Sequence, residues 1–230
     1  MQIEYTLIDT NDTEIGELTL YKYQAETGET GYEIRINDNF LMGTHGALGE
    51  VIMANVAHRY LKKQENIHVL IGGLGAGHTL RTVLDLPGIS KVVVAEIGSK
   101  VEKWNQLYFA ESNGNAVSDP RVTVIVSDLA KVIAQSESDY DLMLLDVDNG
   151  PDWLAAEGNA RLYKEDGIKD CLKSLTPKGI LAVWSPGKNR KFMDALNASC
   201  PHVKCIESGS VSDENGPEDV TYLASNQPLK

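Results

Sequence analysis

Residues 67–77 read Ile-His-Val-Leu-Ile-Gly-Gly-Leu-Gly-Ala-Gly, and residues 91–98 read Lys-Val-Val-Val-Ala-Glu-Ile-Gly. The first stretch predicts a buried strand followed by a glycine-rich turn, and the second predicts another buried strand that ends in a carboxylate. A helix fits between them and completes a β-strand–helix–β-strand unit. Such a unit is the first half of a nucleoside-binding α/β domain.

The glycine-rich turn indicates a ligand, because a ligand approaches the backbone closely only where no Cβ intervenes. Gly73, Gly75 and Gly77 provide such a surface. Glu96 lies 19 residues after Gly77, where an acid can accept hydrogen bonds from both hydroxyls of a ribose. His78 stands where the dinucleotide fingerprint has its third glycine, which favours an S-adenosyl nucleoside over NAD. The alternative is an ordinary turn that binds nothing.

The rest of the chain predicts an α/β fold of the class I methyltransferase-like Rossmann type. Apolar runs covered on both faces are typical of parallel strands joined by crossover helices. The last two predicted strands have no helix between them, which indicates an antiparallel hairpin at the edge of a mostly parallel, seven-stranded sheet. Downstream of residue 98 we expect helices at 100–112, 129–134, 163–175 and 192–196, and strands at 121–126, 140–145, 180–184, 203–206 and 220–224. Pro177 and Gly179 are expected to stop the third of these helices.

The first 60 residues differ in character. Residues 5–8, 17–23 and 32–36 alternate apolar and polar side chains between turn-forming segments, which predicts a small antiparallel β-meander. A helix over 47–61 then leads into the main domain. We therefore divide the chain into residues 1–60, the N-terminal meander with its linking helix, and residues 61–230, the Rossmann-like nucleoside-binding domain.

Composition limits the classes of function. The chain has 230 residues, 42% of them hydrophobic, and a net charge of -12. This negative charge disfavours binding to nucleic acid and would attract a cationic small molecule, although many acidic proteins are simply soluble. No apolar run approaches the roughly 18–20 residues that cross a membrane, and three cysteines without metal-site spacing predict neither disulfides nor a metal centre. We expect a cytoplasmic protein without a metal.

Candidate site residues follow the carboxyl ends of the predicted strands, where open α/β sheets bind ligands. Asp128 followed by Leu129 suits the edge of an adenine, since the carboxylate accepts from the exocyclic amine and the Leu129 amide donates to the ring. Alternatively, Asp128 only caps the helix that begins at Leu129. The complete set is Gly73, Gly75, Gly77, Glu96, Ile97, Asp128, Leu129, Asp146 and Asp148.

Five motifs follow the predicted meander in a fixed order. They are Gly-Gly-Leu-Gly-Ala-Gly at 72–77, Val-Val-Val-Ala-Glu-Ile at 92–97, Asp-Pro-Arg-Val at 119–122, Ser-Asp-Leu-Ala at 127–130 and Tyr-Asp-Leu-Met-Leu-Leu-Asp-Val-Asp-Asn-Gly-Pro at 140–151. In order and spacing, residues 32–190 resemble the spermidine synthase (polyamine aminopropyltransferase) family. Each motif alone occurs in many S-adenosylmethionine-dependent methyltransferases, whereas the meander and the Asp-rich loop before Pro151 point to aminopropyltransferases.

The resemblance implies a transferase that moves an aminopropyl group from decarboxylated S-adenosylmethionine to a diamine. It assigns Glu96 to the ribose, Asp128 to the adenine, and Asp146 to the carboxylate that accepts the amine proton. Asp148 falls in the equivalent of the gate loop, so Asp146 and Asp148 are the catalytic candidates. The implied donor is S-adenosylmethionine or its decarboxylated form, and the implied partner is a small molecule such as a polyamine.

Two departures from the family concern the amine half of the site. The family usually carries an aspartate inside the glycine loop, whereas this loop holds Leu74 and Ala76. Residues 46–50 keep only Glu50 of the usual Asp-Glu and Tyr-His-Glu groups. A small-molecule methyltransferase and a non-catalytic nucleoside-binding homologue therefore remain as alternatives.

The remaining candidates have structural alternatives. His45 and His78 could serve as bases, but histidines in turns are more often structural. Trp153 could belong to a lid. The aromatic side chains of Trp104, Tyr108 and Trp184 fit core positions better. The exposed edges of the meander favour a homodimer, because pairing between subunits would cover them.

Overall fold

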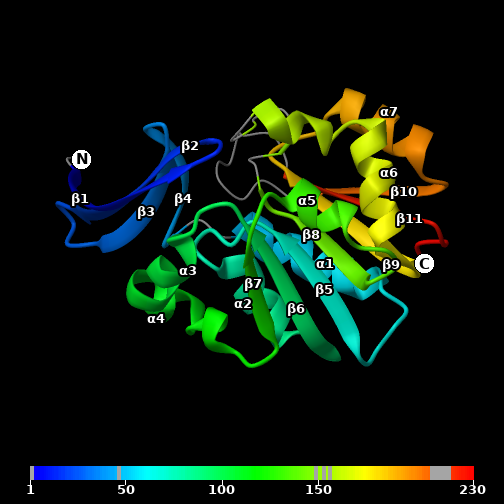
Figure 1. Ribbon diagram of the computed structural model, residues 1–230, viewed down its shortest axis with the longest axis horizontal. Coiled ribbons are helices and arrows are strands. Elements are labelled where there is room, and N and C mark those ends of the chain that lie inside the picture. The colour runs from blue at the N-terminus through cyan, green and yellow to red at the C-terminus, as the bar shows by residue number, and fades with distance from the viewer. Residues whose placement is uncertain (1–2, 46–47, 148–149, 152–153, 155–156, 208–218) are drawn as a thin grey trace.

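Two β-sheets lie side by side in the computed structural model, which describes residues 3–45, 48–147, 150–151, 154, 157–207 and 219–230 (Figure 1). The smaller sheet is antiparallel, in the order β1-β2-β3-β4. Its strands are β1 (Ile3–Thr13), β2 (Gly16–Ala25), β3 (Thr30–Ile36) and β4 (Asn39–Gly43). The three predicted strands are confirmed and longer than expected.

Strand β4 was not predicted. Asn37 and Asp38 form the turn before it with φ of 48° and 65°, the left-handed conformation that two-residue hairpin turns require. The strand itself is short, and its register with β3 shifts between Ile34 and Arg35. A five-residue strand with a bulge opposite it leaves little alternation to detect.

The larger sheet has seven strands in the order β10-β11-β9-β8-β5-β6-β7. The five strands β9, β8, β5, β6 and β7 pair in parallel, and β11 is antiparallel to both of its neighbours, β10 and β9. The predicted fold class is therefore confirmed. The strands are β5 (Ile67–Gly72), β6 (Ile89–Glu96), β7 (Val122–Val126), β8 (Tyr140–Leu145), β9 (Leu175–Ser185), β10 (His202–Glu207) and β11 (Val220–Ser225).

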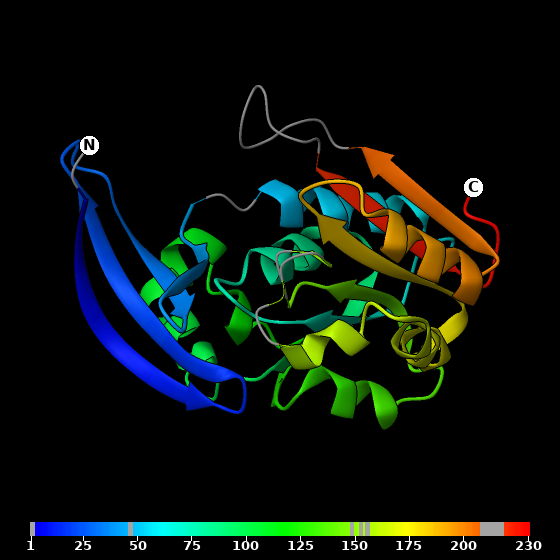
Figure 2. The ribbon, with the colours of Figure 1, turned by 90° about the horizontal axis from the view of Figure 1, so that it is seen from above.

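Helices cover both faces of this sheet (Figure 2). Alternate residues of β8 belong to separate cores, because Leu142 and Leu144 pack beneath α1 and α2 while Met143 and Leu145 pack beneath α5, α6 and α7. This burial on both faces explains the continuous apolar runs of the sequence. The helices are α1 (Leu48–Tyr60), α2 (His78–Asp85), α3 (Val101–Trp104), α4 (Ala110–Asn113), α5 (Leu129–Ala134), α6 (Glu165–Ser174) and α7 (Arg190–Ser199), with the shorter turns η1 (Asn105–Phe109), η2 (Ala116–Ser118) and η3 (Glu157–Arg161).

Two segments differ from the predicted elements. The helix expected at 100–112 is broken into α3, the π-helical turn η1 and α4. Helix α6 ends at Ser174, and β9 begins at once with Leu175, so Pro177 and Gly179 lie inside a strand and do not stop the helix. The pairing of β9 with β8 skips the residues between Leu175 and Ile180, which accommodates a proline that cannot donate to the ladder.

The small sheet is docked on α3 by polar contacts. Asp9 of β1 accepts hydrogen bonds from the Lys100 ammonium at 2.8 Å and the Trp104 indole at 3.0 Å. These two bonds lower the pKa of Asp9 to about 2. Trp104 is otherwise buried, as expected for a core residue, and Tyr108 and Trp184 pack at the edge of the same core.

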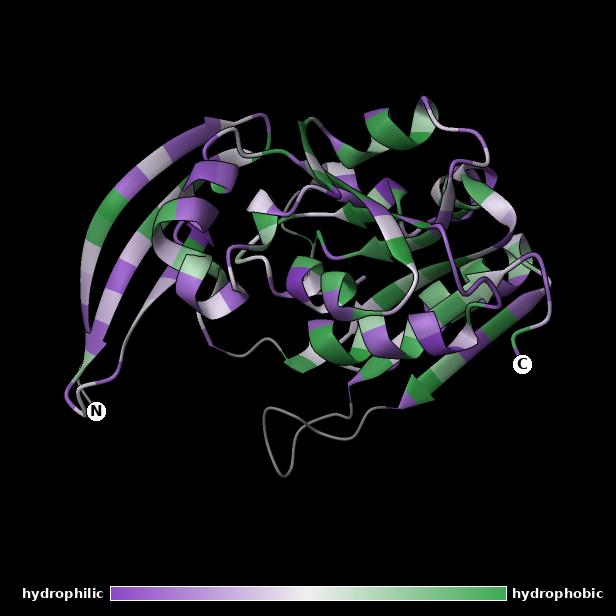
Figure 3. Cartoon of the chain, turned by 90° about the horizontal axis from the view of Figure 1, so that it is seen from below, coloured by the Kyte–Doolittle hydropathy of each residue, from purple (hydrophilic) through white to green (hydrophobic). Residues whose placement is uncertain are grey.

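Hydrophobic colour concentrates on the strands of the large sheet, whereas the long strands of the small sheet alternate (Figure 3). No helix in the described ranges is long and apolar enough to cross a membrane. Helix α1 packs against β8, β9 and α2. The division of the chain after residue 60 stays a prediction.

Candidate functional site

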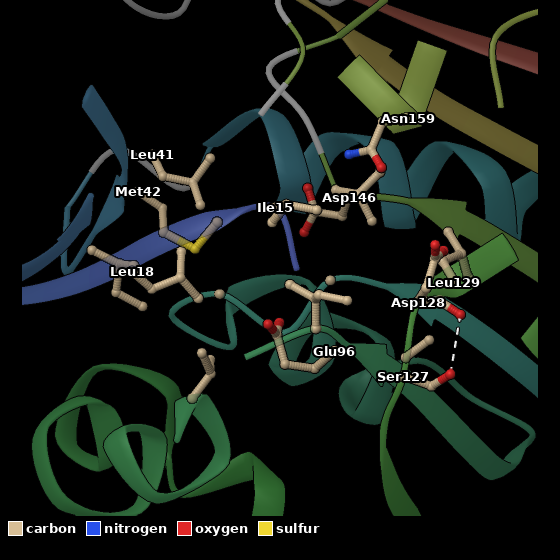
Figure 4. Close-up of a pocket in the computed structure, with 18 residues that line it drawn as sticks. Ile15, Leu18, Leu41, Met42, Glu96, Ser127, Asp128, Leu129, Asp146 and Asn159 are labelled. Atoms are coloured by element: carbon tan, nitrogen blue, oxygen red, sulfur yellow. Dashed lines mark hydrogen bonds between the residues drawn. The ribbon is translucent and has the colours of Figure 1, made fainter. Parts of the chain in front are cut away.

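A pocket opens at the carboxyl ends of β5, β6, β7 and β8, and the small sheet forms its remaining wall (Figure 4). Seven of the nine site residues predicted from the sequence line it: Gly73, Gly75, Glu96, Ile97, Asp128, Leu129 and Asp146. Gly77 lies behind the pocket, at the start of α2. Asp148 and Trp153 fall outside the described residues.

The glycine loop, residues 73–77, requires glycine at its pocket-lining positions. Gly73 and Gly75 have φ of 88° and 51°, in the left-handed region. A Cβ at Gly73 would lie 2.5 Å from the Asp146 carbonyl oxygen, and one at Gly75 would lie 1.9 Å from the Met42 sulfur. The loop backbone therefore contacts Asp146 on one side of the pocket and Met42 on the other.

Glu96 binds the loop from the pocket side. Its carboxylate accepts hydrogen bonds from the Leu74 amide at 2.8 Å and the Gly98 amide at 2.7 Å. Burial raises its pKa, and these amide bonds act in the opposite direction. A carboxylate offers about four acceptor positions. Besides the Leu74 and Gly98 amides, those of Gly75 and Ile97 also lower its pKa, so a sugar hydroxyl bound here would share the carboxylate's acceptor positions with backbone amides.

Two buried asparagines bind the loop from the opposite side. Asn105 Nδ2 donates to the Gly75 carbonyl at 2.7 Å, and Asn113 Nδ2 donates to the Ala76 carbonyl at 2.8 Å. Asn113 also donates to Asn105 Oδ1 at 2.7 Å. A Cβ at Gly77 would lie 2.5 Å from Asn105 Oδ1, so the third glycine is needed for this packing. This pair was not predicted from the sequence, although η1, which contains Asn105, is a π-helical turn of the kind often found near functional sites.

Asp128 has both roles that the sequence left open. Its Oδ1 accepts from the Ala130 amide at 2.7 Å and caps α5. The residue also lines the pocket, together with Leu129 and with Ser127, whose hydroxyl donates to the Asp128 carbonyl (Figure 4). The cap uses Oδ1 and orients the carboxylate. The other oxygen, Oδ2, stays available to a ligand.

Asp146 is partly buried at the floor of the pocket and accepts from the Thr79 hydroxyl at 2.6 Å. Its burial and the neighbouring Glu50 carboxylate raise the pKa of Asp146 well above the usual value, while the Thr79 bond acts in the opposite direction. Burial and the charge of Asp219 likewise raise the pKa of Glu50. A carboxylate with a raised pKa is a suitable proton acceptor, because its driving force for proton transfer near neutral pH is larger.

The histidines have structural contacts. His78 Nε2 lies 3.2 Å from the Gly43 carbonyl, and burial lowers its pKa. His45 is exposed and lies 3.3 Å from Glu29 Oε1. Neither residue is among those that line the pocket.

The small sheet contributes pocket residues that the sequence analysis did not identify. They carry no motif and lie far from the glycine loop in the chain, so only the docking of the two sheets reveals them. These residues are Ile15, Leu18, Ile34, Leu41 and Met42.

Known proteins match this chain in both sequence and fold. A family model described as the spermine/spermidine synthase domain matches residues 50–203. A polyamine aminopropyltransferase of Prochlorococcus marinus (strain CCMP1986) is 33% identical over 119 residues, which are 51% of this chain and 40% of that protein. Another, from strain MIT 9312, is 30% identical over 174 residues, 70% of this chain and 60% of that protein. The chain thus spans about half the length of the curated relatives it matches.

A solved structure has the same fold. The spermidine synthase of Thermotoga maritima superposes with a TM-score of 0.76 at 16% sequence identity, over 97% of this chain and 74% of that one. The fold class predicted from the sequence is therefore that of a known architecture.

We expect that Asn113→Ala destabilises the chain by about 1–3 kcal/mol, because the buried Ala76 carbonyl and Asn105 lose a partner. Urea unfolding measures this change. Asn197→Ala is the matched control, since Asn197 donates to the Met193 carbonyl from an exposed helix face, and we expect a change of about 0.5 kcal/mol or less. Equal losses in the two variants would contradict a special role for the buried pair.

Proposed function

Because the chain belongs to the spermine/spermidine synthase family, we propose that it is a transferase that binds an S-adenosyl donor and transfers an alkyl group to a small, cationic amine. The observation that carries this proposal is the convergence of Glu96, Asp128 and Asp146 on one pocket. The three carboxylates come from the ends of β6, β7 and β8, where an open α/β sheet binds its ligand.

We infer one orientation for a bound nucleoside from the distribution of polar and apolar residues in the pocket. Glu96 lies between the Asp128 group on one side and Leu18 and Met42 on the other (Figure 4). With the ribose hydroxyls on Glu96 and the adenine amine on Asp128, the 5′ carbon is directed away from β7. It then faces the space between Asp146 and the small sheet.

The chemistry of such a transfer is an in-line displacement at a carbon activated by sulfonium. The nucleophilic amine must be oriented and must lose a proton. Asp146 is the residue that we assign to both tasks, because its raised pKa favours proton acceptance and Thr79 fixes one of its oxygens. The net charge of -12 supports a cationic acceptor. Both S-adenosylmethionine and its decarboxylated form are candidate donors.

Methyl transfer is the second candidate, and a specific observation favours it. The pocket wall from the small sheet is apolar, and the glycine loop has no acid to balance the charge of an aminopropyl group. A homologue that binds nucleosides without catalysis is the third candidate. We also propose a cytoplasmic location, where the free cysteines Cys171, Cys200 and Cys205 would stay reduced.

Calorimetry with S-adenosylmethionine, its decarboxylated form and methylthioadenosine tests nucleoside binding. We expect binding, and we expect Asp128→Asn to weaken it about tenfold, because the amide oxygen must face Ala130 and leaves the NH₂ group against the adenine amine. Asparagine caps as well as aspartate, so stability should change little. Asp128→Ala, which loses the cap as well, is the control. Unchanged affinity in Asp128→Asn would leave Asp128 with capping alone.

A product assay with putrescine and decarboxylated S-adenosylmethionine tests the assignment of Asp146. We expect Asp146→Asn to lose activity and to gain stability at neutral pH. A carboxyl whose pKa is raised on folding stabilises the folded chain at pH values below its unfolded-state pKa of about 4. This stabilisation is lost as the pH rises through the folded-state pKa. Unfolding at about pH 5 and about pH 8 should therefore differ less in the variant than in the wild type.

Asp194→Asn changes an exposed carboxylate and is the control, with activity and pH dependence expected to match the wild type. An active Asp146→Asn enzyme would remove Asp146 from the proposed role.

We also propose a homodimer formed through the small sheet. Strand β1 is an edge strand, and its Ile3, Tyr5 and Leu7 are 41%, 44% and 51% exposed. Analytical ultracentrifugation should give the mass of two 25.2 kDa chains, and Leu7→Lys should shift it towards one. Leu107→Lys alters an exposed leucine in η1 and should leave the dimer intact. A monomeric wild type, or equal dissociation of both variants, would contradict this interface.

A further inference from the structure

The end of the pocket formed by the small sheet is apolar. Among the described residues, this end is lined by Ile15, Leu18, Ile34, Leu41, Met42 and Val101. The pocket's carboxylates belong to other walls and have other partners: Glu96 accepts from loop amides, Asp128 caps α5 and Asp146 accepts from Thr79. A charged group buried among these six apolar side chains would lose water, and none of the six could give it a counter-charge.

Met42 and Gly75 fit together at this end. Gly75 has φ of 51°, and a Cβ on it would lie 1.9 Å from the Met42 sulfur and 2.6 Å from Met42 Cε. The thioether thus occupies the volume that a side chain at position 75 would take. Methionine is flexible and polarisable, and it fills irregular apolar space well.

The backbone that carries Met42 is fixed in place. Met42 pairs with Ile34 in the register of β3 and β4. His78 Nε2 contacts the Gly43 carbonyl at 3.2 Å, which ties the end of β4 to the first turn of α2. Thr44 donates to the Tyr32 carbonyl at 2.8 Å, just beyond the strand. Met42 is therefore held against the glycine loop from both neighbouring elements.

We propose that Met42 is a specificity-determining residue, which selects adenine nucleosides with a small, uncharged group on the 5′ sulfur and disfavours those with an ammonium group. This inference rests on the proposed function, since it assumes that the ribose lies on Glu96. In that orientation the 5′ substituent extends towards Met42 and Leu18 (Figure 4). A methylthio group there meets apolar side chains, whereas an aminopropyl or aminocarboxypropyl group brings a charge.

Calorimetry on the full chain measures the ratio of affinities for methylthioadenosine and decarboxylated S-adenosylmethionine. We expect the wild type to prefer methylthioadenosine by about tenfold or more. Met42→Leu is the matched apolar variant and should keep this ratio within about twofold. Met42→Glu supplies a carboxylate at the same place and should reverse the preference.

Met42→Ala is a second variant, which keeps the test decisive if circular dichroism shows that the Met42→Glu chain does not fold. By enlarging the apolar end it should lower the ratio about fivefold, since the longer substituent gains room and water. The inference is overturned if the wild type prefers the charged nucleoside, or if Met42→Ala and every folded Met42→Glu sample keep the wild-type ratio. If no nucleoside binds the wild type, the proposed function itself fails and this inference falls with it.

Discussion

The candidate site depends on a glycine loop whose polar backbone is held from two sides. The Glu96 carboxylate accepts from loop amides on the pocket side, and Asn105 and Asn113 donate to the Gly75 and Ala76 carbonyls behind it. Buried backbone groups need such partners, because a missing one costs as much as a lost hydrogen bond. The loop can therefore stay glycine-rich and still have one conformation, so that a ligand meets a preformed surface.

Much of the fold could be predicted because the central strands of the large sheet are buried on both faces. Runs such as Leu142–Leu145 have no polar interruption, and only a parallel sheet with helices on both sides buries them completely. The prediction failed where pairing, and not composition, determines structure. Strand β4 depends on a two-residue turn and a bulge, and β9 runs through Pro177 because its ladder with β8 skips that stretch.

The site could be predicted in part for a related reason. Glu96, Asp128 and Asp146 end strands that lie close to one another in the large sheet, so the topology alone places them at one edge. Met42 and Leu18 reach the same pocket from a separate sheet, and the local sequence around them indicates only short strands. Asn105 was hidden by the π-helical turn, which shifts side chains away from the spacing of a regular helix.

Both sheets line the pocket, so a bound ligand would affect how the chain unfolds. Besides apolar packing, polar contacts attach the small sheet and its β1–β2 turn: Asp9 to Lys100 and Trp104, Asn11 to Ser99 and the Lys100 amide, Glu14 to Lys131, and Gly43 to His78. A bound molecule that touches both walls would join the two sheets noncovalently. Because a ligand of the folded state adds stability in proportion to the logarithm of its concentration, occupancy couples the unfolding of one sheet to that of the other. We therefore expect a bound ligand to increase the cooperativity with which the two sheets unfold.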